Sequence, residues 1–132
     1  MKHIRDIQWI DHNLIVLAAN QKLGYIRLTP DAQVENIVMF PEFHKDTIRE
    51  ICVSEGNKNL VISGGFDGNV FVTDISRLVS DIQKNEKKSE NSLYPCRDVV
   101  GSVNWHPYDN FVASCTTDTG VLHMYRFPNF EI

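Results

Sequence analysis

The sequence has few cysteines, and their arrangement excludes two structural classes. Only Cys52, Cys96 and Cys115 occur in 132 residues, and no two of them form a Cys-x-x-Cys pair. An odd and widely spaced set of this kind is not a disulfide framework, and it lacks the thiolate spacing of a structural zinc site. We therefore expect free thiols and a reducing compartment, which is the cytoplasm or the nucleus.

Long apolar runs and an excess of basic charge are also missing. The longest apolar run, Leu14 to Ala19, has six residues, whereas a membrane-spanning helix needs about 18. The start of the chain, MKHIRDIQWI, places Arg5 and Asp6 where a secretory signal would carry its apolar stretch, so we expect neither secretion nor membrane insertion. The net charge of −4 argues against direct binding of nucleic acid.

Short strand-like segments make up most of the sequence. Those in the first third are IRDIQWI, LIVLAA, GYIRL and VENIVMF, each bounded by Asn, Asp, Gly or Pro. Four such segments in one unit predict an all-β fold of four-stranded antiparallel sheets. Residues 84–92 (KNEKKSENS) contain no hydrophobic side chain and are predicted to be a charged, solvated loop insertion.

These segments recur along the chain at a nearly constant spacing. Ile4 and Ile7 recur 44 residues later as Ile48 and Ile51, and the segment LVISGGFDGNVFV aligns with FVASCTTDTGVLH at an offset of 51 residues. Such spacings fall in the range of about 40 to 50 residues that propeller blades use. They divide the chain into three units of approximately residues 1–43, 44–95 and 96–132.

Two motifs in these units resemble parts of the WD-repeat β-propeller family. WHPYDNFVAS, from Trp105 to Ser114, resembles the turn and second strand of a blade, and SGGFDG, from Ser63 to Gly68, resembles the turn between the second and third strands. The resemblance covers nearly the whole chain. It implies a partial β-propeller of about three blades from a larger ring, which acts as a non-catalytic scaffold that docks partner proteins or peptides on its loop faces as a subunit or adaptor of a larger complex.

The resemblance also implies a structural network of polar residues within each blade. Members of the family join a histidine, a serine, an aspartate and a tryptophan by hydrogen bonds. In the second unit the first three are present and Thr73 replaces the tryptophan; in the third unit Cys96 replaces the histidine. The residues assigned to this network are His44, Ser63, Asp67, Ser114 and Asp118.

The residues themselves predict no catalytic, cofactor or metal site. The five histidines lack metal-ligand spacing, and no serine lies in a G-x-S-x-G elbow. The glycines of GGFDG lack the GK[ST] ending of a phosphate-binding loop. Asp67 could be a catalytic carboxylate, but an Asp-Gly pair between hydrophobic runs is first of all a hairpin signal. We therefore predict that the chain is not an enzyme.

Partner binding is predicted at the rim formed by the loops. Phe66 directly precedes the turn aspartate, and an aromatic residue at a loop tip either anchors a protein interface or packs against a neighbouring loop. Two residues are aligned with it in the other units, and two aspartates lie in the loops that lead into the next unit. The predicted patch consists of Phe66, Lys22, Thr117, Asp46 and Asp98.

Three units are too few to close a propeller ring, so both terminal sheets need a cover. We expect further blades or self-association to provide it, and we interpret Met1 followed at once by a strand as a fragment of a longer ring. Trp9 and Trp105, at matching strand positions, are predicted to be buried between sheets. The alternative function is that of a propeller segment of an enzyme or ubiquitin-ligase substrate receptor whose active part lies outside the chain.

Overall fold

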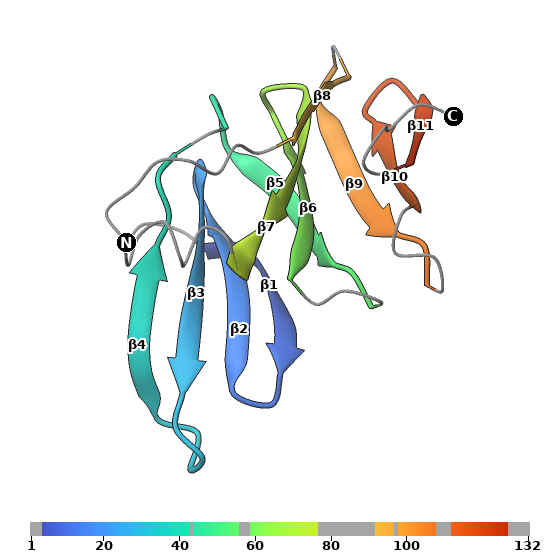
Figure 1. The fold of residues 1–132 in the computed structure, drawn as a ribbon. Coiled ribbons are helices and arrows are strands. Elements are labelled where there is room, and N and C mark those ends of the chain that lie inside the picture. Colours follow the sequence, from blue (N-terminus) through green and yellow to red (C-terminus); the bar gives the residue numbers. More distant parts are fainter. Residues whose placement is uncertain are drawn as a thin grey trace.

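The computed structural model describes residues 4–42, 44–55, 59–76, 92–96, 98–107 and 112–126. Within these ranges the strands pair antiparallel with their chain neighbours and form three separate sheets (Figure 1). The predicted all-β fold is therefore confirmed. No helix in the described part of the chain is long and apolar enough to cross a membrane.

Each sheet is a meander whose strands lie in chain order, and the three sheets are called blades 1, 2 and 3 below. Blade 1 consists of β1 (Ile4–Asp11), β2 (Leu14–Ala19), β3 (Lys22–Leu28) and β4 (Val34–Met39). Blade 2 consists of β5 (Ile48–Val53), β6 (Leu60–Gly65), β7 (Asn69–Asp74) and β8 (Ser92–Pro95). The described strands of blade 3 are β9 (Val100–Trp105), β10 (Val112–Thr117) and β11 (Leu122–Arg126).

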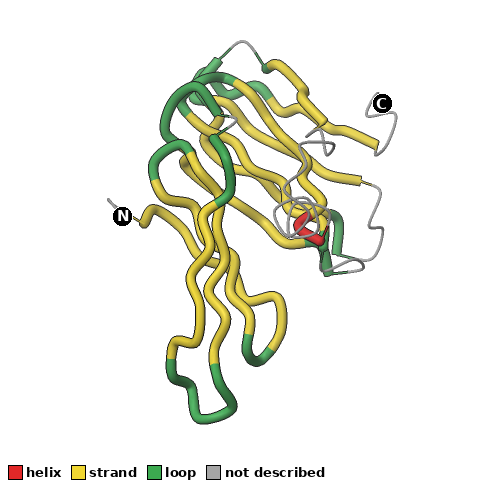
Figure 2. The backbone as a smooth tube through the Cα atoms, turned by 60° about the vertical axis from the view of Figure 1, so that its left-hand side comes forward, coloured by secondary structure: helices red, strands yellow, loops and turns green. Residues whose placement is uncertain are grey.

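The blades are arranged as an arc of a β-propeller. The first strand of each blade contacts the first strand of the next, β1 with β5 and β5 with β9. Figure 1 labels these strands, and Figure 2 shows the chain turned by 60° with the strands in yellow. Among the described strands no comparable contact joins β9 back to β1, so the arc is open. The turns β2–β3, β6–β7 and β10–β11 lie at one end of the blades, which is the upper end in Figure 1, together with the loops that enter β5 and β9.

The hydrophobic core lies between the blades in two clusters. Blade 2 contributes to both, because successive residues of a strand point to opposite faces. On β6, Val61 faces blade 1 whereas Leu60 and Ile62 face blade 3, and all three are buried. This explains why β6 is apolar at every one of these positions, as expected for a strand that is covered on both faces.

A β-bulge recurs in the first strand of every blade. The ladder skips one residue, which is Arg5 in β1, Arg49 in β5 and Gly101 in β9. A bulge bends the strand and redirects the side chain of the extra residue. The bulge directs both arginines toward the end of the blades at which the β6–β7 turn lies, where both contact Phe66.

The residue after each bulge joins neighbouring blades. Asp6 accepts a hydrogen bond from the backbone amide of Ile51 at 3.0 Å. One blade further, Glu50 accepts from the amide of Val103 at 3.3 Å and from the hydroxyl of Ser102 at 3.1 Å. The same kind of carboxylate contact thus holds both interfaces.

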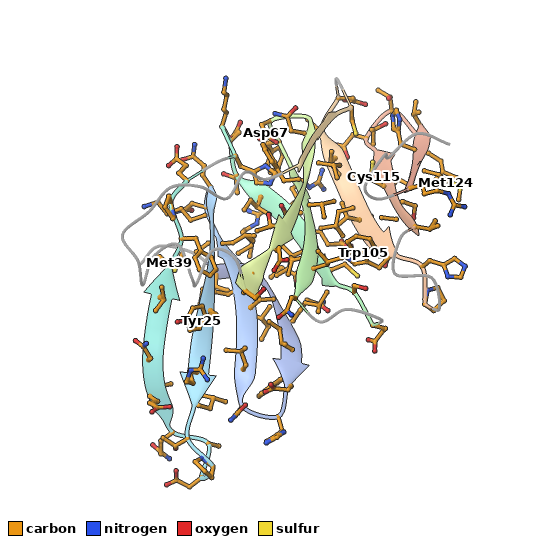
Figure 3. All side chains as sticks on the ribbon, viewed as in Figure 1. Tyr25, Met39, Asp67, Trp105, Cys115 and Met124 are labelled. Atoms are coloured by element: carbon orange, nitrogen blue, oxygen red, sulfur yellow. The ribbon has the colours of Figure 1, made fainter. Side chains whose placement is uncertain are left out.

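The two tryptophans differ, which corrects part of the sequence prediction. Trp105 is buried, and its indole Nε1 donates to the backbone oxygen of Cys52 in blade 2 at 3.0 Å (Figure 3). Trp9 holds the matching position but is exposed. The physical reason is that Trp105 has a neighbouring blade on its side of the sheet and Trp9 has none among the described residues.

The predicted insertion at 84–92 lies outside the described residues except for Ser92. Ser92 is the first residue of β8, which pairs with β7. The division into units at residues 43 and 95 stays a prediction, and the described blades span Ile4–Met39, Ile48–Pro95 and Val100–Arg126.

Candidate functional site

The loop between β4 and β5 is fastened to the β6–β7 turn by a histidine. His44 Nδ1 lies 2.9 Å from Asp67 Oδ2, and His44 Nε2 lies 2.9 Å from Ser63 Oγ. Asp67 also accepts hydrogen bonds from the backbone amides of Lys45 and Asn69, at 3.0 and 3.2 Å. The structure thus brings together the three residues that the sequence assigned to the network of this blade (Figure 3 labels Asp67).

Burial favours the neutral form of the histidine in this network. Burial lowers the pKa of His44, although the charge of Asp67 and its hydrogen bond act in the opposite direction. A neutral ring that carries its proton on Nδ1 donates to Asp67 and accepts from the Ser63 hydroxyl, so both nitrogens are satisfied. The side chain of His44 is almost completely buried, and its ring packs edge-on against Phe71 with centroids 4.6 Å apart.

The fourth member of the network is missing. Thr73 is buried, and its hydroxyl has no hydrogen-bond partner among the described residues. A buried hydroxyl without a partner costs free energy, because it has lost its hydrogen bonds to water. The network fixes a loop to a turn, and the side chains of His44, Ser63 and Asp67 are buried.

Blade 3 follows blade 2 at an offset of 52 residues, one more than the sequence alignment predicted. Ile51 lies opposite Ser63 in blade 2, and Val103 lies opposite Cys115 in blade 3. The turns agree, because Gly68 and Gly120, also 52 residues apart, both have positive φ, of 73° and 86°. A turn position with positive φ favours glycine, so the two glycines mark equivalent turn positions and fix the register.

This register corrects the roles of Ser114 and Asp118. Cys115, and not Ser114, is the counterpart of Ser63, and its sulfur lies 3.5 Å from that of Cys96, the counterpart of His44. Ser114 is half-buried on the other face of β10, opposite Met124 and Asn104. The alignment was wrong because it matched identical residue types across a shift of one position.

In blade 3 an aspartate of the entering loop replaces the turn aspartate. The counterpart of Asp67 is Thr119, which donates its backbone amide and its hydroxyl to Asp98 Oδ2 at 3.1 and 2.5 Å. These bonds, that of the Thr119 hydroxyl foremost, lower the pKa of Asp98. Asp98 also accepts from the Val99 amide at 2.7 Å, so this carboxylate is engaged within its own blade.

Asp118 lies at the loop rim instead. It is the counterpart of Phe66, since the Phe66 amide donates to the Thr47 oxygen and the Asp118 amide donates to the Val99 oxygen. Its carboxylate oxygens lie 2.9 and 3.1 Å from Nη1 of Arg49. This ion pair joins the first strand of blade 2 to the turn of blade 3.

Phe66 lies between two arginines at this rim. The guanidinium carbon of Arg49 is 5.1 Å from the centroid of the Phe66 ring, and that of Arg5 is 6.0 Å away. Both distances are within the range of cation–π attraction. Phe66 remains 41% exposed, so the arginines hold its ring without covering it. Arg5, Arg49 and Phe66 are called the rim patch below.

The sequence prediction missed both arginines, although a signal for them was present. The first strands of blades 1 and 2 read IRDI and IREI, so an arginine and an acidic residue recur together with the isoleucines. The third copy, VGSV, has lost both charges. A repeated charged pair inside a buried strand pattern marks a position with a special backbone geometry, in this case the bulge.

The other residues of the predicted patch lie in different environments. Thr117 is buried at the end of β10, so its side chain is not at the rim. Lys22 is exposed and begins β3 directly after the turn at Asn20 and Gln21. Asp46 is exposed, and its carboxylate accepts from the amide of Thr47 at 2.7 Å.

No group of three or more His, Cys, Asp or Glu side chains in the described ranges could hold a metal ion. None of the described cysteines, Cys52, Cys96 and Cys115, forms a disulfide bond. Burial raises the pKa of the Cys52 thiol, and nearby carboxylates add to this effect. The thiol form is therefore favoured, which reduces its nucleophilic reactivity.

Comparison with protein families gives a match that covers more than half of the chain. The family described as WD domain, G-beta repeat matches residues 36–74 and 88–124. The chain belongs to the WD-repeat family. The first matched WD repeat begins within β4 of blade 1 and ends with β7 of blade 2, so the sequence repeat is displaced from the blade by one strand. No individual curated protein matches the chain.

Proposed function

We propose that this WD-repeat chain is a non-catalytic docking scaffold whose rim patch binds a protein partner. The observation that carries the proposal is the exposed Phe66 ring, which is held between Arg5 and Arg49 at the end of the blades that carries the β6–β7 turn. Aromatic residues and arginine are enriched among the residues that dominate binding energy at protein interfaces. Because the arginines restrain the ring before binding, little side-chain entropy is lost on docking.

The charges of the patch indicate what kind of partner segment fits. Arg49 is paired with Asp118, whereas Arg5 forms no ion pair with any described residue. A partner that places an apolar side chain on Phe66 and a carboxylate near Arg5 would satisfy both groups. We therefore assign the patch to a short acidic segment with an exposed apolar side chain.

Variants of Phe66 test this function in the full-length protein. Phe66→Ala removes the apolar anchor and is expected to reduce co-purification of the direct partner by about tenfold or more, as for a central interface residue. Arg5→Ala is expected to weaken the same partner less. Val34→Ala is the control, because Val34 is an exposed apolar residue of β4 that lies away from the rim patch.

Quantitative mass spectrometry of the purified complexes gives the measurement, with the melting temperature of each variant recorded alongside. The same partners at the same abundance with Phe66→Ala and with wild type would contradict the proposal. A loss that Val34→Ala reproduces would also contradict it, because the effect would then not belong to the patch.

The proposal includes the setting in which the scaffold works. The open arc supports an assembly in which further blades or a second subunit cover the terminal sheets. Cysteines that form no disulfide among the described residues support a reducing compartment, the cytoplasm or the nucleus.

A further inference from the structure

Blade 3 contains two cysteines whose sulfur atoms are in contact. Sγ of Cys96 lies 3.5 Å from Sγ of Cys115, although the two residues are 19 positions apart in the chain. Cys96 directly follows β8 and begins the loop that enters β9, whereas Cys115 lies in the middle of β10 (Figure 3 labels Cys115). Both residues are buried, with 8% of Cys96 and 2% of Cys115 exposed.

The pair takes the place of a polar contact that fastens the matching loop in blade 2. There the ring of His44 lies 2.9 Å from the hydroxyl of Ser63, and the loop is held by that hydrogen bond. A thiol is only a weak donor and a weak acceptor, so the contact between Cys96 and Cys115 fastens the loop of blade 3 less strongly. Two thiols can hold a loop as firmly as the histidine does only by forming a covalent bond.

The surroundings of the two sulfurs allow this bond. The sulfurs need to approach one another by about 1.5 Å to reach the length of a disulfide bond. Cys115 is fixed in the sheet, opposite Val103 on one side and His123 on the other. Cys96 lies between two strands and outside the ladder, so its backbone can make the movement. Sγ of Cys52 instead contacts the backbone oxygen of Val53, at 3.8 Å.

We propose that Cys96 and Cys115 form a redox modification site, at which a hydroperoxide converts the two thiols into a disulfide that locks the entering loop of blade 3 to β10. The Cys96 thiolate, on the more exposed residue of the two, attacks the peroxide; the O–O bond breaks, and a sulfenic acid and an alcohol or water are formed. The Cys115 thiolate then attacks the Cys96 sulfur, the S–S bond forms, and the sulfenic oxygen leaves as water. The two thiols lose two electrons and two protons in total, and the peroxide is reduced.

The reaction is reversible in a reducing compartment. A second dithiol attacks the disulfide and is itself oxidised, which returns Cys96 and Cys115 to thiols. Disulfides in such compartments are usually transient and respond to the redox state. The dithiol form in the structure is therefore the resting form, and the disulfide is the form that follows exposure to peroxide.

The loop that the disulfide would lock joins the turns of two blades. The amide of Cys96 donates to the backbone oxygen of Gly68, in the β6–β7 turn of blade 2, at 2.8 Å. Two residues further along the loop, Asp98 accepts from the amide of Thr119, in the turn of blade 3. A bond at Cys96 thus restricts a segment that contacts both turns. The inference rests on the thiol contact and not on the rim patch, so it stands or falls separately from the proposed docking function.

Mass spectrometry of the 132-residue chain tests the inference. The purified chain is treated with hydrogen peroxide, the peroxide is removed with catalase, and the remaining thiols are alkylated after unfolding. We expect alkylation at Cys52 alone, in place of all three cysteines of the untreated chain. Trypsin cleaves at Arg97, between the other two cysteines, so their disulfide appears as two linked peptides. Dithiothreitol before alkylation is expected to restore all three thiols.

Matched variants separate the pair from the third cysteine. Cys52→Ala is the control and is expected to form the same link as the wild type. Cys115→Ser removes the second thiol, so the reaction should stop at the Cys96 sulfenic acid, which dimedone labels. A disulfide that includes Cys52, or one that joins two chains, would overturn the inference. Oxidation of Cys52 while Cys96 and Cys115 remain thiols would overturn it as well.

The locking effect is measured on the wild type alone, which keeps the inference testable if a variant does not fold. The melting temperature of the oxidised chain is expected to be about 5 °C or more above that of the reduced chain, because the disulfide restricts the unfolded state. Hydrogen exchange at the Cys96 amide, followed by NMR, is expected to become about tenfold slower on oxidation. An unchanged or lower melting temperature together with unchanged exchange would overturn the locking role.

Discussion

Blades 2 and 3 fasten the same loop to the same turn with different chemistry. In blade 2 the ring of His44 bridges Ser63 and the turn carboxylate of Asp67. In blade 3 two thiols replace the ring and the hydroxyl, and the carboxylate has moved to the entering loop as Asp98, where it binds Thr119. The backbone register therefore preserves the position of the contact, while the residue that supplies the charge can change.

The largest expected difference between the blades is the cost of removing the bridging side chain. His44→Ala removes the hydrogen bonds to Ser63 and to the Asp67 carboxylate, which is only 3% exposed, and leaves a cavity beside Phe71, so we expect a loss of about 3 kcal/mol in the free energy of unfolding. Cys96→Ala removes only a weak thiol contact and some packing, so its cost should be about 1 kcal/mol. Urea unfolding measures both, and an equal or larger loss for Cys96→Ala would contradict the comparison.

A smaller effect of opposite sign is expected at Thr73. Its buried hydroxyl has no partner among the described residues, so Thr73→Val keeps the shape and removes an unsatisfied polar group. We expect the free energy of unfolding to rise by about 1 kcal/mol. Calorimetry checks this, with Thr116→Val on the exposed face of β10 as the control. A lower melting temperature for Thr73→Val would show that the hydroxyl is used.

The protonation of His44 makes the stability depend on pH. Burial lowers the pKa of His44 in the folded chain, so the unfolded chain binds the proton more readily. The corresponding stability is present above the ordinary histidine pKa of about 6.5 and is lost as the pH falls below it. Between about pH 7.5 and about pH 6 we expect the wild type to lose more stability than His44→Gln. This difference should be smaller than the effects predicted above for His44→Ala, Cys96→Ala and Thr73→Val, because His44 is only partly protonated in this pH range. Parallel pH profiles of the two chains would contradict this expectation.

The strands and the family could be predicted from the sequence because both depend on local pattern. The period-two alternation and the Gly and Asp turn residues identify β6 and β7 directly. His44 could be placed with Ser63 and Asp67 because the family resemblance supplied the pairing. The register of blade 3 could not be predicted in this way. Ser114 and Asp118 are of the expected residue types, but each lies one position before the true counterpart of Ser63 or Asp67, as the turn at Gly120 shows.

The exposure of side chains on the open face of blade 1 could not be predicted from the sequence pattern either. Trp9 and Trp105 occupy the same position in their strands, and only the presence or absence of a neighbouring blade distinguishes them. Thr117 was predicted at the rim and is buried because it corresponds to Gly65, at the end of its strand, and not to Phe66 in the turn.

In blade 3 the anchoring carboxylate is that of Asp98 and not that of Asp118. The most direct test is hydrogen exchange at the Thr119 backbone amide, followed by NMR near neutral pH, in wild type and in two matched variants. The structure predicts that Asp98→Asn speeds exchange at this amide, whereas Asp118→Asn leaves it unchanged because Asp118 contacts Arg49 instead. Faster exchange in Asp118→Asn together with unchanged exchange in Asp98→Asn would show that Asp118, and not Asp98, anchors the turn.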